Sequence, residues 1–281
     1  MSKNEFLVFN DVSFKYPPIE GDLDENENQV IPSFIFEHFS AQLPEGFTSI
    51  IGPNGCGKST LMLLASGRLK CETGNVFLYG IDPVSLEEES KNLLASVIYQ
   101  NMEFETEDKV SDLLKQVFEN GGYKGEMLSL TGNFNSLYDE VIFVFELKDE
   151  LDKELKNLSK GQMQRVLLAF SVLYGSKSIF MDEPLYAMED NQKEKSLEYL
   201  AELCKSFNVS IYISMHELDL TRKYAQNVLL MKPNRDMVLG TPEEVMTSDE
   251  LESAYGVPAS MLKHQESMTR DNLNQWAQSL K

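Results

Sequence analysis

The sequence is poor in cysteine, has a single tryptophan and contains no long apolar run. Its three cysteines, Cys56, Cys71 and Cys204, have the spacing of neither a metal site nor a disulfide framework, so we expect a reducing, cytosolic environment. No apolar run approaches the roughly 20 residues that a membrane-spanning helix requires. The first residues lack the apolar core of a secretion signal, and we therefore expect a chain that is not exported.

Basic residues are scarce relative to acidic ones. The 281 residues include 25 Lys and Arg against 45 Asp and Glu, which gives a formal net charge of -20. Nucleic-acid phosphates and anionic lipids repel such a surface, so we expect no direct nucleic-acid binding and any membrane contact through a protein partner. Hydrophobic residues (42%) and charged residues (25%) are otherwise typical of a soluble globular chain. The length suits one large domain or a domain with an added lobe.

A glycine-rich stretch, Gly-Pro-Asn-Gly-Cys-Gly-Lys-Ser-Thr at 52–60, is the most informative part of the sequence. An apolar run at 47–51 precedes it and a helix-like run at 61–65 follows it, which is the context of a phosphate-binding P-loop. The glycines allow backbone N–H groups to point at phosphate oxygens, and the helix N-terminus adds a favourable dipole. We expect Lys58 to contact the β- and γ-phosphates of a nucleoside triphosphate and Ser59 to bind Mg²⁺. The alternative is a chance glycine-rich turn, but strand, loop and helix all agree.

Two acidic residues, Asp182 and Glu183, follow an apolar strand predicted at 178–181. Strand ends in parallel α/β sheets lie at the ligand crevice. We expect Asp182 to hold Mg²⁺ with its waters, and Glu183 to orient and deprotonate the attacking water. Such a pair is often only the solvated start of a loop, but the upstream P-loop favours the catalytic interpretation.

Strand-like and helix-like runs alternate along the chain, which predicts an α/β fold with a mostly parallel core sheet. Between about 102 and 175 the sequence has helical periodicity and no convincing central strand, which indicates an inserted helical lobe. The acidic stretch at 20–29 is expected to be a solvated loop, with a metal site there as a remote alternative. The predicted strands cover 6–9, 12–16, 33–39, 47–51, 75–79, 94–100, 178–181, 209–214, 228–231 and 237–239, and the predicted helices cover 110–118, 137–145, 162–174, 192–207, 242–247 and 249–255.

The segment Leu-Ser-Lys-Gly-Gln at 158–162, directly before a predicted helix, resembles the Leu-Ser-Gly-Gly-Gln signature of the ABC ATPase family. The other motifs of that family follow in the expected order over roughly residues 5 to 257. They are the aromatic Tyr16, the Walker A motif at 52–60, the Q-loop Gln100, the Walker B acid and base Asp182 and Glu183, and the H-loop His216. The resemblance implies a P-loop nucleoside triphosphatase with a mostly parallel core sheet, an N-terminal antiparallel β subdomain and an inserted helical subdomain.

The resemblance also assigns a role to each motif residue. Catalytic roles fall to Lys58, Glu183 and His216, and Mg²⁺ binding falls to Ser59, Gln100 and Asp182. ATP is expected to contact Tyr16, Gly52, Pro53, Asn54, Gly55, Cys56, Gly57, Lys58, Ser59, Thr60 and Gln100. The signature residues Leu158, Ser159, Lys160, Gly161 and Gln162 are expected to cap the γ-phosphate held by a partner subunit, because a helix start forms an anion site. Tyr16 and Gln100 have the alternative interpretation of ordinary strand-end residues, and His216 that of a structural histidine.

Two positions depart from the family pattern. Lys160 replaces the first glycine of the signature, where its side chain could point outward or add positive charge near the nucleotide. The D-loop at 184–189 ends in Glu189, or one residue later in Asp190, where the family has Asp, and this makes coupling between subunits less certain. Neither change removes a phosphate ligand or the base, so an active ATPase is expected.

A single nucleotide domain without a membrane span suggests the separate energy subunit of a transporter. The resemblance implies transmembrane permease subunits as partners, an ATP-induced homodimer or a heterodimer with a related ATPase, and indirect contact with a substrate-binding protein. The expected location is cytoplasmic, at the inner face of the membrane and attached through the permease. We place the nucleotide-binding domain at 1–257, its helical subdomain at about 102–175 and a polar tail at 258–281.

The end of the domain, at 240–257, is similar to the ATPases of metal-chelate importers for iron-siderophore, haem or cobalamin. Zinc or manganese importers and some exporters have similar endings, so an exporter subunit remains an alternative. A soluble ABC ATPase that remodels a protein or nucleic-acid complex is a second alternative. A P-loop kinase or GTPase is disfavoured because the sequence has no base-specifying Asn-Lys-x-Asp motif.

Overall fold

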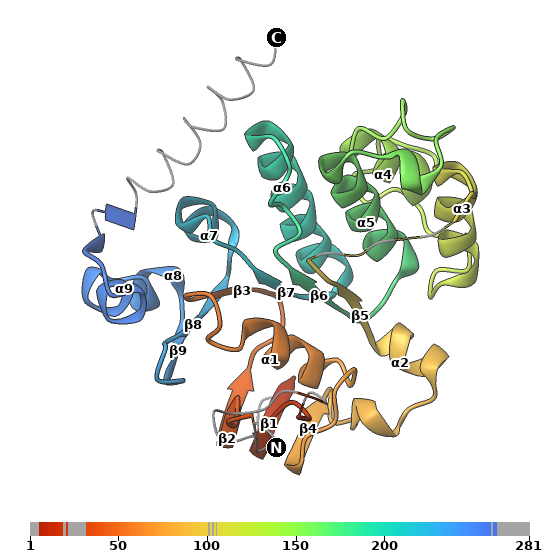
Figure 1. The fold of residues 1–281 in the computed structure, drawn as a ribbon. Coiled ribbons are helices and arrows are strands. Elements are labelled where there is room, and N and C mark those ends of the chain that lie inside the picture. Colours follow the sequence, from red (N-terminus) through yellow and green to blue (C-terminus); the bar gives the residue numbers. More distant parts are fainter. Residues whose placement is uncertain are drawn as a thin grey trace.

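The computed structural model describes residues 6–18, 21, 32–100, 102, 104, 106–259 and 261–262. The acidic stretch predicted at 20–29 and the tail predicted at 258–281 lie outside the described residues, apart from a few positions. Two sheets and a group of helices make up the described part (Figure 1). Within it, no helix has both the length and the apolar character that crossing a bilayer would require.

A six-stranded sheet forms the centre of the molecule, with the strand order β5-β6-β7-β3-β8-β9. All neighbouring strands from β5 to β8 are parallel, and β9 pairs with β8 in the antiparallel direction. The strands are β3 (Phe47–Ile51), β5 (Ala95–Ile98), β6 (Ser178–Asp182), β7 (Ser210–Ser214), β8 (Asn227–Met231) and β9 (Met237–Gly240). The four central strands are almost wholly buried, as expected for parallel strands covered on both faces.

A smaller antiparallel sheet has the order β2-β1-β4, with β1 (Leu7–Phe14), β2 (Phe36–Leu43) and β4 (Thr73–Leu78). The prediction of two strands at 6–9 and 12–16 with a turn between them was wrong. A single strand continues through Asp11, which has φ 50°, and its register with both neighbours shifts there. An irregularity of this kind keeps the strand in the sheet but resembles a turn in the sequence, because Asp and Asn favour turns as well.

Helix α1 (Lys58–Ala65) lies between the two sheets (Figure 1). Its apolar side chains, such as Leu61 and Leu64, are buried in a core that joins the small sheet to β6 and β7. On the opposite face of the large sheet lie α6 (Asp190–Phe207) and α7 (Leu218–Tyr224). The helix that follows the P-loop is therefore fixed between two sheets.

Three further helices, α3 (Val110–Asn120), α4 (Leu137–Val144) and α5 (Lys160–Tyr174), form the helical part at the upper right of Figure 1. They lie where helices without a central strand were predicted, and their apolar faces share one core. The remaining helical elements are α2 (Glu88–Leu94), α8 (Pro242–Val245), α9 (Ser248–Tyr255) and the 3₁₀ turns at Pro83–Ser85 and Leu155–Asn157. Helices α2 and α7 were not predicted, because seven residues are too few to show a clear helical period.

Candidate active site

The glycine-rich loop joins the buried strand β3 to the first residue of α1. Gly52 and Gly57 have φ values of 145° and 106°, which side chains other than glycine rarely adopt. A Cβ on Gly52 would lie 2.3 Å from the carbonyl oxygen of Met231 in β8. The loop is therefore pressed against the neighbouring strand and ends directly at a helix N-terminus, the arrangement that presents backbone N–H groups to phosphate.

Lys58 is buried in this loop, with 6% of its surface exposed. Its Nζ donates hydrogen bonds to the carbonyl oxygens of Gly52 (2.9 Å) and Pro53 (3.1 Å). The ammonium group thus lies at the loop and has compact, rotatable donors that suit phosphate oxygens.

A cavity of about 340 Å³ opens at the loop. It joins the P-loop to side chains that lie far away in the sequence but were predicted to share one site. The residues that line it are Ile35, Asn54, Gly55, Gly57, Lys58, Ser59, Thr60, Gln100 and Glu183.

The two predicted acids lie at the end of β6, beside the end of β7. Glu183 has φ 48°, and its N–H donates to the hydroxyl oxygen of Ser214 (2.8 Å), which in turn donates to Asp182 Oδ1 (2.6 Å). Ser214 fixes both acids, yet the sequence analysis assigned it no role. The only indication of this role in the sequence is that Ser214 ends a predicted buried strand two residues before His216.

Gln100 and His216 both bind the carboxylate of Glu183. Gln100 Nε2 lies 2.6 Å from Oε2, and His216 Nε2 lies 2.6 Å from Oε1. The hydrogen bond with His216 is the main reason that the pKa of Glu183 is lowered, burial opposes it, and the charges of His216 and Lys58 lower the pKa further. The structure thus brings two predicted residues, Gln100 and His216, to the carboxylate of a third, Glu183.

We expect His216→Ala to shift the acid limb of the kcat/KM profile for ATP hydrolysis to higher pH. Glu183 accepts a proton only when ionised, and kcat/KM reports ionisations of the free enzyme. Without His216, burial raises the pKa of Glu183, and the Lys58 charge and the hydrogen bond from Gln100 remain to oppose it. The variant should therefore lose activity at a higher pH than the wild type, in which the pKa of Glu183 is lowered.

ATPase rates between about pH 4 and pH 8 would measure this shift. His38→Ala is the matched control, because His38 also binds a carboxylate, that of Asp11 (2.9 Å), but on the exposed edge of the small sheet. An acid limb that stays in place in His216→Ala would contradict the coupling.

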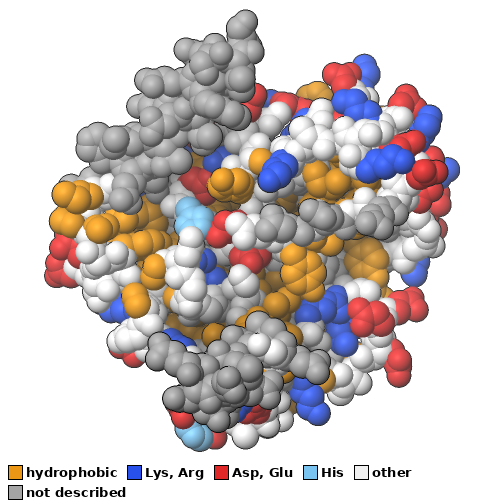
Figure 2. All heavy atoms as spheres, viewed as in Figure 1, with side chains coloured by type: hydrophobic (Ala, Val, Ile, Leu, Met, Phe, Trp, Pro, Cys, Tyr) orange, Lys and Arg blue, Asp and Glu red, His pale blue; other side chains and the backbone are white. Residues whose placement is uncertain are grey.

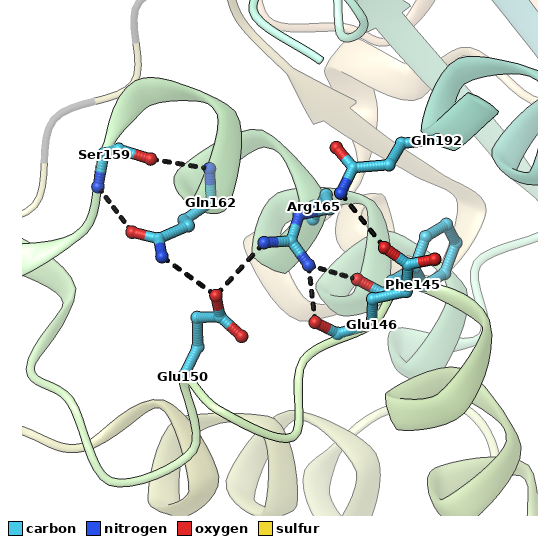
Figure 3. Close-up of polar contacts among 7 residues, drawn as sticks. All are labelled: Phe145, Glu146, Glu150, Ser159, Gln162, Arg165 and Gln192. Atoms are coloured by element: carbon cyan, nitrogen blue, oxygen red, sulfur yellow. Dashed lines mark hydrogen bonds and ion pairs between the residues drawn. The ribbon is translucent and has the colours of Figure 1, made fainter. Parts of the chain in front are cut away.

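The signature segment begins helix α5 and does not line the cavity. Ser159 is the N-cap residue: its hydroxyl accepts from Gln162 N–H (3.3 Å), while Gln162 Oε1 accepts from Ser159 N–H (2.9 Å) (Figure 3). Both Ser159 and Lys160 are exposed. The lysine that replaces a glycine in the motif therefore causes no steric conflict.

The signature helix is packed against the D-loop. A Cβ on Gly161 would lie 2.5 Å from the carbonyl oxygen of Ala187, and Ala187 N–H donates to Gln164 Oε1 (2.7 Å). Glu189 is the N-cap residue of α6 and Asp190 its first residue. Gly161 is thus required for close contact between these two segments, whereas position 160 has no such constraint.

The family model described as "ABC transporter" matches residues 36–186, which is more than half of the chain. The chain belongs to the ABC transporter family. It binds and hydrolyses ATP, as its ATP-binding relatives do.

Two relatives illustrate the similarity of this ABC ATPase to known proteins. The phosphonates import ATP-binding protein PhnC 2 of Oceanobacillus iheyensis is 28% identical over 241 residues, which cover 82% of this chain and 91% of the relative. The petrobactin import ATP-binding protein FatE of Bacillus anthracis is 29% identical over 220 residues, which cover 78% of this chain and 86% of the relative.

Solved structures have the same fold. A metal-chelate type ABC transporter in an inward-facing conformation matches with a TM-score of 0.65 and 21% identity, covering 91% of this chain and 90% of the other. The dimeric ATP-binding cassette MJ0796 with bound ADP and Pi matches with a TM-score of 0.67 and 19% identity, covering 84% and 99%.

The donor set of this ABC ATPase fits Mg²⁺ held partly by the nucleotide. Among the described residues, no group of three or more His, Cys, Asp and Glu side chains could hold a metal ion by itself. Ser59 and Gln100 line the cavity, and Asp182 lies at the strand end beside it. Hydroxyl, amide and carboxylate oxygens, completed by phosphate oxygens and water, are the ligands that Mg²⁺ prefers.

Two tyrosines contact the Walker A motif of the ABC domain from outside the cavity. The hydroxyl of Tyr16, a residue that is 39% exposed, lies 3.1 Å from Thr60 Oγ1, and its ring makes a T-shaped contact with that of Phe14. The hydroxyl of Tyr255, at the end of α9, accepts from Gly52 N–H (3.0 Å). Sequence analysis gave Tyr255 no role, because no local pattern connects it to a loop 203 residues away.

Proposed function

We propose that this chain is the ATPase subunit of a membrane importer and works as a dimer with two composite ATP sites. The proposal rests on one observation: within one chain, the cavity and the signature segment are separate. Lys58, Gln100 and Glu183 line the cavity, whereas Ser159 caps an exposed helix start that does not. A second chain, arranged head to tail, would place its signature helix start against each cavity as an anion-binding site.

Each residue has a role that follows from its position. Lys58 would bind the β- and γ-phosphates, and Tyr16 would offer its exposed ring to adenine. Ser59, Gln100 and Asp182 would hold Mg²⁺, which neutralises charge on the phosphates when bound. Glu183 would orient the attacking water and take its proton, and His216 would contact the γ-phosphate.

The contacts of Glu183 suggest how hydrolysis depends on assembly. With Gln100 on one oxygen and His216 on the other, the carboxylate has both oxygens engaged. Binding of nucleotide and of a partner's signature would draw Gln100 and His216 towards phosphate. The Glu183 carboxylate would then be free to bind the attacking water. Closing the dimer and activating the base thus become one event, and hydrolysis would reopen the dimer.

A permease would bind between the helical part and the core. Figure 2 shows apolar side chains at the surface in this central region, whereas charged side chains gather at the outer edge over the helical part. Tyr99 is 40% exposed and directly precedes Gln100, so a partner that contacts Tyr99 would lie one residue away from the cavity lining. Binding to a permease places the chain at the inner face of the membrane, with a substrate-binding protein as an indirect partner.

Import of a metal chelate is the cargo class that we propose. The names of the relatives include import of petrobactin, hemin and cobalamin, and also of phosphonates. The sequence at 240–257, which includes α8 and α9, resembles the domain end of metal-chelate importer ATPases, a resemblance shared with zinc or manganese importers and some exporters. An exporter subunit or a soluble remodelling ATPase is not favoured, because relatives that match over most of their length are import proteins.

Mixing two inactive variants tests the composite site. Lys58→Ala damages the P-loop side of a site and Ser159→Arg the signature side, so each variant alone should be inactive. In a mixed dimer one site collects both defects and the other has none. ATPase activity should therefore reappear on mixing, as measured by phosphate release.

The matched control mixes Lys58→Ala with Glu183→Gln. Both changes lie on the same side of the site, so no dimer of these chains contains an intact site. Activity that reappears in the control, or that fails to reappear with Ser159→Arg although mixed dimers form, would contradict the composite site.

A further inference from the structure

A buried ion pair lies directly behind the start of the signature helix. Glu150, in the turn after α4, and Arg165, on the second turn of α5, have side chains that are 5% and 9% exposed, and Arg165 Nη2 lies 3.1 Å from Glu150 Oε1. Arg165 Nη1 donates to the carbonyl oxygens of Phe145 (2.9 Å) and Glu146 (2.5 Å). Removing two charges from water is costly, so a pair in this position calls for an explanation beyond stability.

Glu150 also contacts the signature glutamine. Its Oε1 accepts a second hydrogen bond from Gln162 Nε2 (2.9 Å), so that it lies between Gln162 and Arg165 (Figure 3). A glutamine amide has one donor end and one acceptor end. Because Glu150 can only accept, it orients the amide so that Gln162 Oε1 faces Ser159 N–H.

We propose that Glu150 is a positioning residue that holds Ser159 ready for the γ-phosphate of a partner chain, an inference that rests on the composite site proposed above. The reciprocal hydrogen bonds between Ser159 and Gln162 fix the serine, and its hydroxyl accepts from Gln162 N–H. Accepting this bond uses a lone pair of the oxygen, so the hydroxyl hydrogen stays available for donation to a phosphate oxygen. Without Glu150 the amide can rotate, and Ser159 N–H loses its acceptor.

The network continues from Arg165 to the helix that follows the D-loop. Glu146, whose carbonyl oxygen binds Arg165, uses its carboxylate to accept from Gln192 (3.0 Å) and Lys195 (2.5 Å) of α6. These contacts join the turn that carries Glu150 to α6, and Figure 3 shows the one from Gln192. The turn that carries Glu150 is therefore held by α6 as well as by the signature helix α5.

The test replaces Glu150 by methionine, which has a similar size and no strong acceptor. In a Glu183→Gln background that retains ATP, we expect the ATP-dependent dimer to become about tenfold weaker or more, since an acceptor in charged hydrogen bonds is lost. Binding of a fluorescent ATP analogue to the monomer should change by less than about twofold, because Glu150 does not line the cavity.

Glu140→Met is the matched control. Glu140 is a fully buried carboxylate of the same helical part, and it accepts from the N–H groups of Leu130 (2.5 Å) and Thr131 (3.1 Å), away from the signature. This variant should lose melting temperature without loss of dimer affinity. If Glu150→Met does not fold, Glu150→Met combined with Arg165→Met removes both buried charges and serves in its place.

A double-variant cycle separates positioning from general damage. If Glu150 acts through Ser159, its replacement in a Ser159→Ala background should weaken the dimer by less than about threefold. Equal losses in both backgrounds, or a Glu150→Met dimer as tight as its parent, would overturn the positioning role alone. A Glu183→Gln parent that forms no dimer with ATP would overturn the composite site and this role with it.

Discussion

Glu183→Gln is expected to reduce ATP hydrolysis by about 10² to 10⁴-fold while nucleotide binding is retained. The glutamine has nearly the same shape, so β6, the φ of 48° and the hydrogen bond from N–H 183 to Ser214 can all persist. An amide cannot take a proton from water at neutral pH, so the attacking water keeps its proton. The rate falls because of chemistry and not because of folding.

Phosphate release and ATP binding, measured on the same preparation, would show this difference. An ATP-dependent dimer should accumulate, because closure occurs and the reopening step does not. Glu217→Gln is the matched control: Glu217 adjoins His216 but pairs with Lys193 and does not line the cavity, so its rate should remain near that of the wild type. Hydrolysis by Glu183→Gln at the wild-type rate would show that Glu183 is not the general base.

Lys58→Ala is expected to abolish the stabilisation of the protein by ATP. The wild type should gain about 2.7 kcal/mol at a ligand concentration of 100 Kd, because ligand that binds only the folded state shifts the unfolding equilibrium. In the variant the phosphates lose their buried cation, and the carbonyl oxygens of Gly52 and Pro53 lose their donor. Thermal unfolding with and without ATP and Mg²⁺ measures the difference.

Lys58→Arg sharpens this test. A planar guanidinium keeps the charge but is larger than an ammonium, and Lys58 lies in a space where only 6% of its surface is exposed. We expect the arginine variant to bind ATP poorly as well, which would show that shape and charge are both needed. An undiminished thermal shift in Lys58→Ala would contradict the assignment of the loop.

The parts of the site that could be predicted are those encoded over short distances in the chain. The P-loop, the acids after β6 and the signature each combine a local motif with the element that follows, and the mostly parallel sheet follows from its apolar runs. Residues that support the site were not predictable in this way. Ser214, Tyr255 and Glu150 meet their partners only in the folded chain.

The error in the small sheet has a similar cause. Asn and Asp in the middle of β1 indicate a turn when only neighbours in sequence are considered. Hydrogen bonding to two strands keeps the backbone extended on either side of Asp11, and Asp11 N–H finds an acceptor in Ser40. Tertiary pairing therefore outweighs the local preference at this point.

The order of strands in the large sheet bears on how the protein is synthesised. β3, which carries the P-loop, pairs with β7 and β8, and Gly52 meets Tyr255 across 203 residues. A nascent chain therefore releases the P-loop from the ribosome long before its neighbours exist. ATP therefore cannot guide the folding of this N-terminal half, and the apolar strand β3 stays without its partners in the large sheet until β7 and β8 have emerged.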